Sequence, residues 1–155
     1  MGDFLSKDRR SALMSRVRNR GTATELYVRR SVWSAGFRYR LNVRKLPGAP
    51  DLVLRRYRTA VLVQGCFWHG HHCRKGQQRP ATNQDFWNKK LDGNIARDAA
   101  NQAELRKLGW SVFVVWECQL SEDTEALVEN LNGMRSSKDS RCLPDSTSAR
   151  RGETH

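Results

Sequence analysis

Nine consecutive residues, 65–73, bring together two thiols, three imidazoles and two large aromatic side chains. Thiolates and imidazoles are the ligands that zinc prefers in proteins, and the spacing of Cys66, His71 and Cys73 lets them meet in one tight loop. This stretch has no obvious fourth ligand, but Cys118, which follows an apolar run, would complete a Cys3His tetrahedron. The alternative is a set of reduced thiols packed beside a polar loop. We expect a structural zinc site.

Asp51 follows Pro50 at the start of a short strand-forming run in a strongly basic chain. Many nucleases hold a divalent cation against the scissile phosphate with such a carboxylate, and oxygen ligands suit Mg²⁺. In the nuclease superfamily named for its Pro-Asp and Asp/Glu-x-Lys elements, the next strand would carry a second acid and a lysine, but residues 62–64 are Leu-Val-Gln. His69 is the candidate substitute, because a neutral imidazole can deprotonate water near pH 7. A turn residue is the alternative for Asp51.

The charge of the chain indicates a polyanionic partner. The 155 residues include 28 Lys and Arg against 16 Asp and Glu, a formal net charge of +12. Residues 1–45 contain twelve basic residues and three acids, so a surplus of nine lies in the first third. Nucleic acid is the commonest polyanion that a basic protein binds. The alternative, a basic surface that only aids solubility, would not need this asymmetry.

The length of the chain and its cysteine content limit the possible domain organisation and cellular compartment. We expect one domain over residues 1–134, with a basic DNA-contacting region at 1–20, and a disordered tail over 135–155. Four cysteines without an N-terminal apolar segment favour a reducing, cytoplasmic setting. No stretch approaches twenty consecutive apolar residues, so no membrane partner is expected.

Hydrophobic periodicity predicts alternating helices and strands around these residues. A Thr22-x-x-Glu25 capping box opens one helix, and Gly93 is where a longer helix could be interrupted. The expected helices are 9–18, one that the Thr22 capping box opens and Gly36 ends, 86–108 and 123–131. The expected strands are 37–43, 51–54, 60–63 and 111–116. The last strand is the most apolar and is expected at the sheet centre. This order predicts an α/β fold, a small mixed sheet flanked by helices on both faces.

Several unusual motifs occur in order along the chain: Pro47-Gly-x-Pro-Asp51, the stretch 65–73, Ala81-Thr82 with Phe86-Trp87, Asn94-x-x-Arg97-Asp98, and Leu108-Gly-Trp110 with Val115-Trp-Glu-Cys118. In these motifs, residues 8–133 resemble the very-short-patch-repair (Vsr) mismatch endonucleases. The resemblance implies a restriction-endonuclease-like core with a structural zinc site. It also implies a Mg²⁺-dependent enzyme that nicks one strand of duplex DNA 5′ to the thymine of a T:G mismatch, the product of 5-methylcytosine deamination.

The resemblance implies catalytic roles at matching positions. Asp51 would be the principal Mg²⁺ ligand, with the backbone carbonyl of Val63 as a further ligand. His69 would be the general base, Asp98 would orient its imidazole, and Glu25 would hold a metal-bound water. A helix cap remains the alternative for Glu25, and a solvated helix charge remains the alternative for Asp98.

The resemblance also implies residues that wedge into the base stack. Phe67, Trp68 and Trp87 would enter beside the mismatch from the major groove, and Met14 from the minor-groove side. Core packing is the alternative for Trp87 and Met14. Family members carry Thr-His or a carboxylate just before Gly65, where this chain has Val-Gln, so no side-chain role carries over to these two positions.

The resemblance further implies a monomer that acts in the bacterial cytoplasm on the nucleoid, with a mismatch-repair matchmaker protein and a repair polymerase as partners. Two other functions stay open. A zinc-stabilised DNA-binding module would bind without catalysis, and a restriction-type nuclease would cut both strands of an unmodified sequence. His72 and Cys142 receive no role.

Overall fold

The computed structural model describes residues 21–141. Met14 and the helix predicted at 9–18 lie outside the described residues. The elements are α2 (Ala23–Ser34), β1 (Arg40–Leu41), β2 (Leu52–Leu54), the 3-10 turn η1 (Arg55–Tyr57), β3 (Thr59–Gln64), α3 (Gln84–Lys107), β4 (Ser111–Trp116), the 3-10 turn η2 (Glu117–Gln119) and α4 (Leu120–Arg141). None of the helices in this described part is long and apolar enough to cross a membrane.

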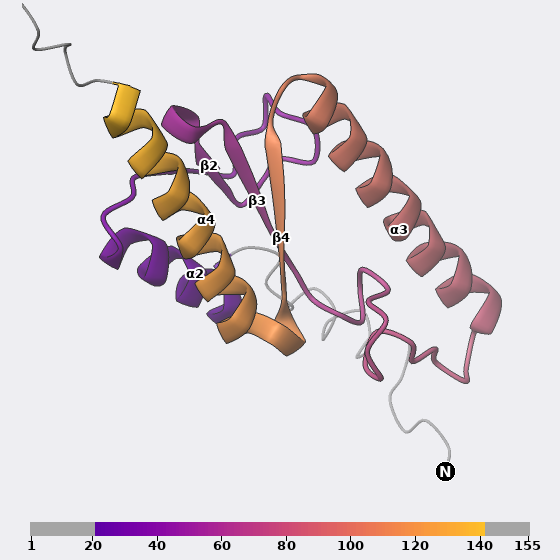
Figure 1. Cartoon of the computed structure of the whole chain (residues 1–155). Coiled ribbons are helices and arrows are strands. Elements are labelled where there is room, and N and C mark those ends of the chain that lie inside the picture. Colours follow the sequence, from indigo (N-terminus) through magenta and orange to yellow (C-terminus); the bar gives the residue numbers. More distant parts are fainter. Residues whose placement is uncertain (1–20, 142–155) are drawn as a thin grey trace, which may run out of the picture.

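The four strands form one mixed sheet in the order β1-β2-β3-β4. The β1–β2 and β2–β3 pairs are antiparallel, whereas β3 and β4 run parallel. The predicted hairpin of β2 and β3 is confirmed; it turns through η1 and Arg58, whose φ is +46°. Helix α3 lies on one side of the sheet, and α2 and α4 lie on the other (Figure 1). The predicted α/β fold with a mixed sheet between helices is therefore confirmed.

The prediction that β4 lies at the sheet centre is wrong. Strands β2 and β3 are the internal strands of the described sheet, and β3 is buried along most of its length, whereas β4 is at the edge. The hairpin places β2 on one edge of β3, and the crossover through α3 brings β4 to the other edge. Both α3 and α4 pack against β4, so its apolar composition reflects cover by helices on two faces rather than a central position.

One hydrophobic core holds the sheet to α2 and α4. The helices contribute residues one turn apart, which is the spacing that points apolar side chains to one face. The fully buried members are Val28 and Val32 of α2, Leu127 and Leu131 of α4, Leu52, Leu54, Val61 and Val115 of the strands, and Phe37. This core holds α2 against the sheet. The start of α2 therefore lies near the end of the sheet at which the polar residues described below meet.

Three further boundaries differ from prediction. Only Arg40–Leu41 of the strand predicted over 37–43 is formed, because Asn42 adopts a left-handed φ of +46°. Helix α3 continues through Gly93, where a side chain would meet nothing within 4 Å. Helix α4 runs to Arg141, so residues 135–141 are helical and do not belong to a disordered tail.

A contact made by Arg135 explains why α4 continues beyond residue 134. Its Nη1 donates a hydrogen bond to the carbonyl oxygen of Ala35 at 3.3 Å, and its guanidinium lies 4.5 Å from the ring centre of Phe37. These contacts join the last turns of α4 to the end of α2. A polar, arginine-rich composition indicated disorder, but the partners of the arginine lie a hundred residues earlier in the chain.

Candidate active site and metal cluster

Asp51 lies directly before β2, where its carboxylate meets the end of β3. Its Oδ2 accepts a hydrogen bond from the backbone N–H of Val63 at 2.7 Å. Burial raises the pKa of the Asp51 carboxyl to about 6, the Val63 N–H opposes this shift, and the nearby Glu25 carboxylate adds to it. The fold therefore holds Asp51 in a position where its negative charge is poorly compensated.

Glu25 has a capping role and also reaches the same pocket. Its backbone N–H donates to the Thr22 hydroxyl at 3.3 Å, as the capping box predicts. Its Oε2 accepts hydrogen bonds from the backbone N–H of Gly21 at 2.8 Å and from Nη2 of Arg29 at 3.0 Å. The side chain is buried and lines the pocket with Asp51. A cap alone does not require this burial, and the role of Glu25 in holding a metal-bound water stays a prediction.

His69 and Asp98 form the closest polar contact of the site. His69 comes from the loop after β3 and Asp98 from the middle of α3, and His69 Nδ1 lies 2.5 Å from Asp98 Oδ2. A carboxylate at Nδ1 favours the tautomer that carries the proton there, which leaves Nε2 as an acceptor. Asp98 is partly buried and bonded, so it is not a solvated helix charge.

These side chains line one pocket of about 260 Å³. The pocket contains the predicted residues Asp51, Glu25, His69, Asp98 and Val63. A wider cleft of about 860 Å³ shares Glu25, Val63, His69 and Asp98 with it and continues past Phe67 and Trp68. The structure therefore brings the predicted catalytic residues together from four separate segments and opens them toward a larger surface.

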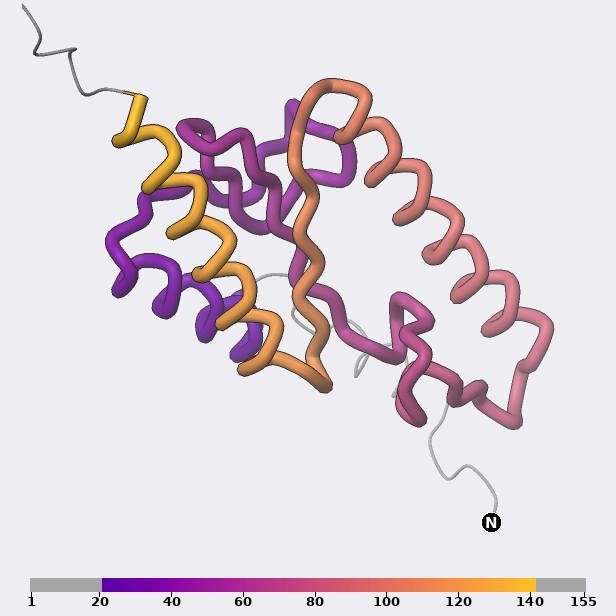
Figure 2. The backbone as a smooth tube through the Cα atoms, viewed as in Figure 1, coloured from indigo at the N-terminus to yellow at the C-terminus, as the bar shows by residue number. Residues whose placement is uncertain are grey.

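The four predicted zinc ligands also converge. The ligand atoms of Cys66, His71, Cys73 and Cys118 all lie within 4.8 Å of one another. The loop between β3 and α3 folds back on itself next to the end of β4 (Figure 2). Cys118 lies in η2, which directly follows β4. Gly76 permits this fold, since an added Cβ would lie 2.0 Å from the carbonyl oxygen of His71. The cluster could hold a zinc ion.

The electrostatics of the cluster fit a cation. A hydrogen bond from His71 lowers the pKa of the Cys73 thiol to about 6. Desolvation, reinforced by the other two thiols, raises the pKa of Cys118 to about 12. Three sulfur atoms this close cannot all be thiolates unless a positive charge lies between them. Trp116 stacks on the His71 ring at 4.3 Å and restricts its rotation.

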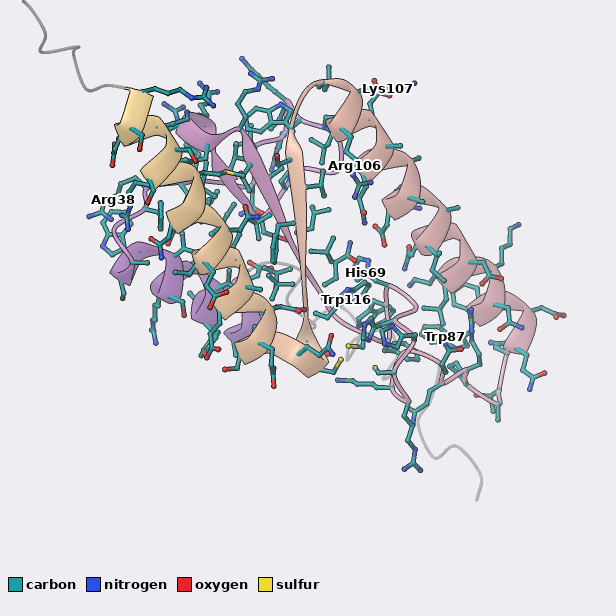
Figure 3. All side chains as sticks on the ribbon, in the orientation of Figure 1. Arg38, His69, Trp87, Arg106, Lys107 and Trp116 are labelled. Atoms are coloured by element: carbon teal, nitrogen blue, oxygen red, sulfur yellow. The ribbon has the colours of Figure 1, made fainter. Side chains whose placement is uncertain are left out.

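The aromatic residues predicted to wedge into DNA form a cluster beside the cleft. The ring centres of Phe67 and Trp68 are 5.1 Å apart, and Trp87 lies 6.1 and 6.0 Å from them. All three are only partly buried. Figure 3 shows Trp87 at the start of α3, on the side of this helix that faces the loop carrying His69. Trp87 belongs to this surface cluster and not to the buried core.

Two residues at the aromatic cluster were missed from the sequence. Phe86 is 57% exposed and contacts Trp87 edge-on, and Lys90 Nζ lies 5.6 to 5.8 Å from the ring centres of Trp68, Phe86 and Trp87. Lys90 follows Phe86 by four residues and Trp87 by three, so helical spacing could have identified it. It adds a positive charge to the edge of an otherwise apolar surface.

Two contacts tie the loop to its surroundings and were also missed. The side chain of Asn94 donates from Nδ2 to the carbonyl oxygen of Trp68 at 3.2 Å. Glu117 accepts from the backbone N–H of Cys66 at 3.4 Å and pairs with Lys75 at 2.7 Å. Both hold the loop from elements distant in sequence, so no local pattern could reveal them.

Comparison with known proteins agrees with this geometry. The family model described as "DNA mismatch endonuclease Vsr" matches residues 2–75. The type II nicking enzyme V.XorIIP of Xanthomonas oryzae pv. oryzae is 47% identical over 79% of this chain and 89% of that protein. The type II nicking enzyme V.NmeAIP of Neisseria meningitidis is 44% identical over 77% and 85%, respectively. The DNA mismatch endonuclease Vsr of Escherichia coli K12 is 38% identical over 84% and 86%.

Proposed function

Because this chain belongs to the Vsr family of DNA nicking endonucleases, we propose that it nicks one strand of duplex DNA 5′ to the thymine of a T:G mismatch. Such a nick would initiate very short patch repair. The observation that carries the proposal is the meeting of Asp51 and the His69–Asp98 pair in one pocket that opens beside an aromatic cluster. The proposed catalytic residues therefore lie next to an aromatic surface that can stack on bases.

His69 is the general base of the proposed reaction. With Nδ1 engaged by Asp98, Nε2 is available to accept a proton from the water that attacks the scissile phosphorus. The Asp98 carboxylate fixes the ring orientation and stabilises the imidazolium that forms. Glu25 lines both the pocket and the cleft, and it would orient this water.

The carboxylates of the pocket fit a divalent cation. Asp51 is desolvated, its pKa is raised to about 6, and the Glu25 carboxylate adds negative charge next to it. The Asp51 carboxylate and the backbone carbonyl of Val63 would hold Mg²⁺, which prefers oxygen ligands and, when bound, neutralises developing charge on the phosphate. Removal of the negative charge on Asp51 by protonation would compete with cation binding, so activity should decrease at acidic pH.

Zinc at Cys66, His71, Cys73 and Cys118 would act structurally, because four protein ligands leave no open position for substrate. The loop residues between the first two ligands include His69 and two members of the aromatic cluster. Fixing this loop would hold the base in register with Asp51, and a misplacement of about 1 Å can cost roughly 100-fold in rate.

The aromatic cluster would offset the cost of opening the base stack. Unstacking a base step costs about a few kcal/mol, and stacking on aromatic side chains can compensate for it. A mismatched pair is easier to unstack than a matched one. Phe67, Trp68 and Trp87 would insert at the mismatch, and Lys90 would contact the neighbouring phosphates. Met14 remains a predicted wedge from the minor-groove side.

A nicking assay with strand-specific labels tests the proposed function. With Mg²⁺, duplexes containing a T:G pair should be cut in the thymine strand alone, and otherwise identical T:A duplexes should stay intact. A DNA-binding module would bind both duplexes and cut neither. A restriction-type nuclease would cut both strands of the T:A duplex. Either of these two results would contradict the proposal.

A further inference from the structure

We propose that Arg29 is a positioning residue, which holds the Glu25 carboxylate so that one of its oxygens faces the catalytic pocket. This inference rests on the proposed function, in which Glu25 orients the attacking water. No role for Arg29 follows from the family resemblance. Its contact with Glu25, its burial and its one unpaired donor support the assignment.

Both hydrogen bonds to the Glu25 side chain end on the same oxygen. Oε2 accepts from Nη2 of Arg29 at 3.0 Å and from the backbone N–H of Gly21 at 2.8 Å. Oε1 accepts no hydrogen bond within residues 21–141, yet it is not a buried unpaired atom of that range, so it is open to water. Because Glu25 lines the pocket and the cleft, Oε1 is the oxygen that can hold a water there.

Arg29 reaches Glu25 from outside the pocket. It follows Glu25 by one turn of α2 and lines neither the pocket nor the cleft. Its carbonyl oxygen accepts a hydrogen bond from the Tyr39 hydroxyl at 2.9 Å. Tyr39 directly precedes β1 and packs against the core, so the backbone of Arg29 is tied to the sheet. The guanidinium is therefore placed to fix Glu25 rather than to contact the substrate.

The burial of Arg29 is unusual for an ion pair four residues apart on a helix. Such pairs lie mostly in solvent, where each contributes little to stability. The side chains of Arg29 and Glu25 are 16% and 5% exposed, and within residues 21–141 Arg29 Nε is the only buried side-chain nitrogen or oxygen without a hydrogen-bond partner. A buried donor without an acceptor costs free energy. Stabilisation of α2 therefore does not explain this arrangement, whereas a role at the pocket does.

The positive charge of Arg29 also suits a pocket that gathers carboxylates. Glu25, Asp51 and Asp98 all line this pocket. Burial raises the pKa of the Asp51 carboxyl to about 6, and the charge of Arg29 opposes this rise. A guanidinium behind Glu25 therefore helps the carboxylates to stay ionised close together before a cation binds.

The variant Arg29→Met keeps an unbranched side chain and removes the guanidinium. We expect single-turnover nicking of a T:G duplex, at saturating protein and Mg²⁺, to fall by about 10–100-fold, the range for loss of a partner that orients the groups around a metal ion. Duplex affinity without Mg²⁺ should stay close to that of the wild type. Arg30→Met is the matched control, since this neighbouring arginine is exposed, and it should nick at the wild-type rate.

Support of α2 is the alternative that these variants separate. If Arg29 only stabilises the helix, Arg29→Met should lower the unfolding midpoint while the folded protein nicks at the wild-type rate. That result would contradict the inference.

Arg29→Lys keeps the test decisive if Arg29→Met folds poorly. Arg29 reaches Glu25 through Nη2, so a single ammonium can replace it as donor and charge. We expect Arg29→Lys to retain most of the nicking rate that Arg29→Met loses. Equal losses in the two variants would mean that neither the charge nor the hydrogen bond matters, and the assignment would be wrong.

A double-mutant cycle tests whether Arg29 acts through Glu25. Glu25→Ala should itself slow nicking, because it removes the oxygen that would hold the water. Adding Arg29→Met to Glu25→Ala should slow nicking no further, since no carboxylate remains to be positioned. Losses that simply add would show that Arg29 acts on another group and would refute the inference.

The backbone amide of Gly21 reports the position of Glu25 without any nicking. Its N–H donates to Glu25 Oε2, so its ¹⁵N–¹H resonance should shift and its hydrogen exchange should accelerate when the carboxylate moves. In protein without DNA or Mg²⁺, we expect both changes in Arg29→Met and neither in Arg30→Met. If both occur in a protein that proves unable to nick T:G duplexes, the proposed function fails and the positioning of Glu25 by Arg29 stands. An unchanged Gly21 amide in Arg29→Met would overturn the positioning itself.

Discussion

The cysteine–histidine cluster and the carboxylate pocket lie at the same end of the sheet, but they are built differently. The cluster takes three of its four ligands from residues 66–73 and closes around a point, with all ligand atoms within 4.8 Å. The pocket takes its side chains from α2, the start of β2, the loop and α3, and it stays open to a wider cleft. Sulfur and imidazole favour a complete tetrahedron, whereas oxygen ligands favour an ion that keeps waters and contacts phosphate.

The two sites should also differ in their effect on stability. Metal binding to the cluster would contribute free energy to folding, because the unfolded chain does not hold four ligands together. The pocket costs free energy, because folding desolvates Asp51 beside Glu25. The cluster would therefore stabilise the fold, whereas the rest of the fold would have to stabilise the pocket. The following changes test this contrast.

Removing the Asp51 carboxylate should have the largest effect. In Asp51→Ala we expect nicking of T:G duplexes to fall by about 10⁴-fold or more at any Mg²⁺ concentration, since cation assistance is worth several kcal/mol. Affinity for the duplex should remain nearly unchanged, because a carboxylate does not attract phosphate. Single-turnover nicking and a fluorescence binding titration measure the two effects. Rescue of the variant by excess Mg²⁺ would place the cation elsewhere.

Replacing the base should have a smaller effect and leave the cation dependence intact. We expect His69→Ala to slow nicking by about 10²–10⁴-fold, the usual contribution of general-base assistance. The Mg²⁺ concentration that gives half-maximal rate should not change, which distinguishes this variant from any change at Asp51. His72→Ala is the matched control, because this exposed imidazole is a neighbour of the cluster without a ligand position. If His69→Ala retains the wild-type rate, another residue is the base.

Disrupting the cluster should instead lower stability. His71→Ala removes a buried ligand and should reduce the free energy of unfolding by about 3–5 kcal/mol, with loss of bound zinc. Metal analysis and denaturant unfolding of this variant and of His72→Ala give the measurement. An unfolding curve for His71→Ala that overlays the wild type would mean that the cluster is not a structural metal site.

Neutralising Asp51 should stabilise the protein in a pH-dependent way. The pKa of Asp51 is about 6 in the folded state against 3.8 for an unperturbed carboxyl, so the folded state binds more protons between these two pH values. The free energy of unfolding of the wild type therefore falls as pH rises from about 4 to 6, by up to about 3 kcal/mol. Asp51→Asn keeps an acceptor for the Val63 N–H and escapes this cost. Its advantage should be absent near pH 3.5 and complete above pH 7.

Mg²⁺ provides the control for that measurement. A cation at Asp51 should stabilise the wild type at pH 7 and leave Asp51→Asn almost unaffected. Denaturant unfolding with and without Mg²⁺ compares the two proteins. Equal stabilisation of both would show that the cation binds outside the pocket.

The sequence by itself determined the parts that depend on local spacing. Three ligands of the cluster lie within eight residues, so their chemistry and separation can be read directly from the chain. The capping box of α2 and the hairpin of β2 and β3 are also local, and both are confirmed. The fourth ligand, Cys118, was predictable because thiolate chemistry leaves few candidates for closing a tetrahedron.

Only the tertiary structure decided what depends on contacts between distant segments. The crossover through α3 placed β4 at the edge of the sheet and brought Asp98 to His69, which lies 29 residues earlier. The same packing gave Asp51 its raised pKa, since burial and a neighbouring carboxylate are properties of the folded chain. Periodicity predicts which residues turn inward, but only packing determines which polar group they meet there.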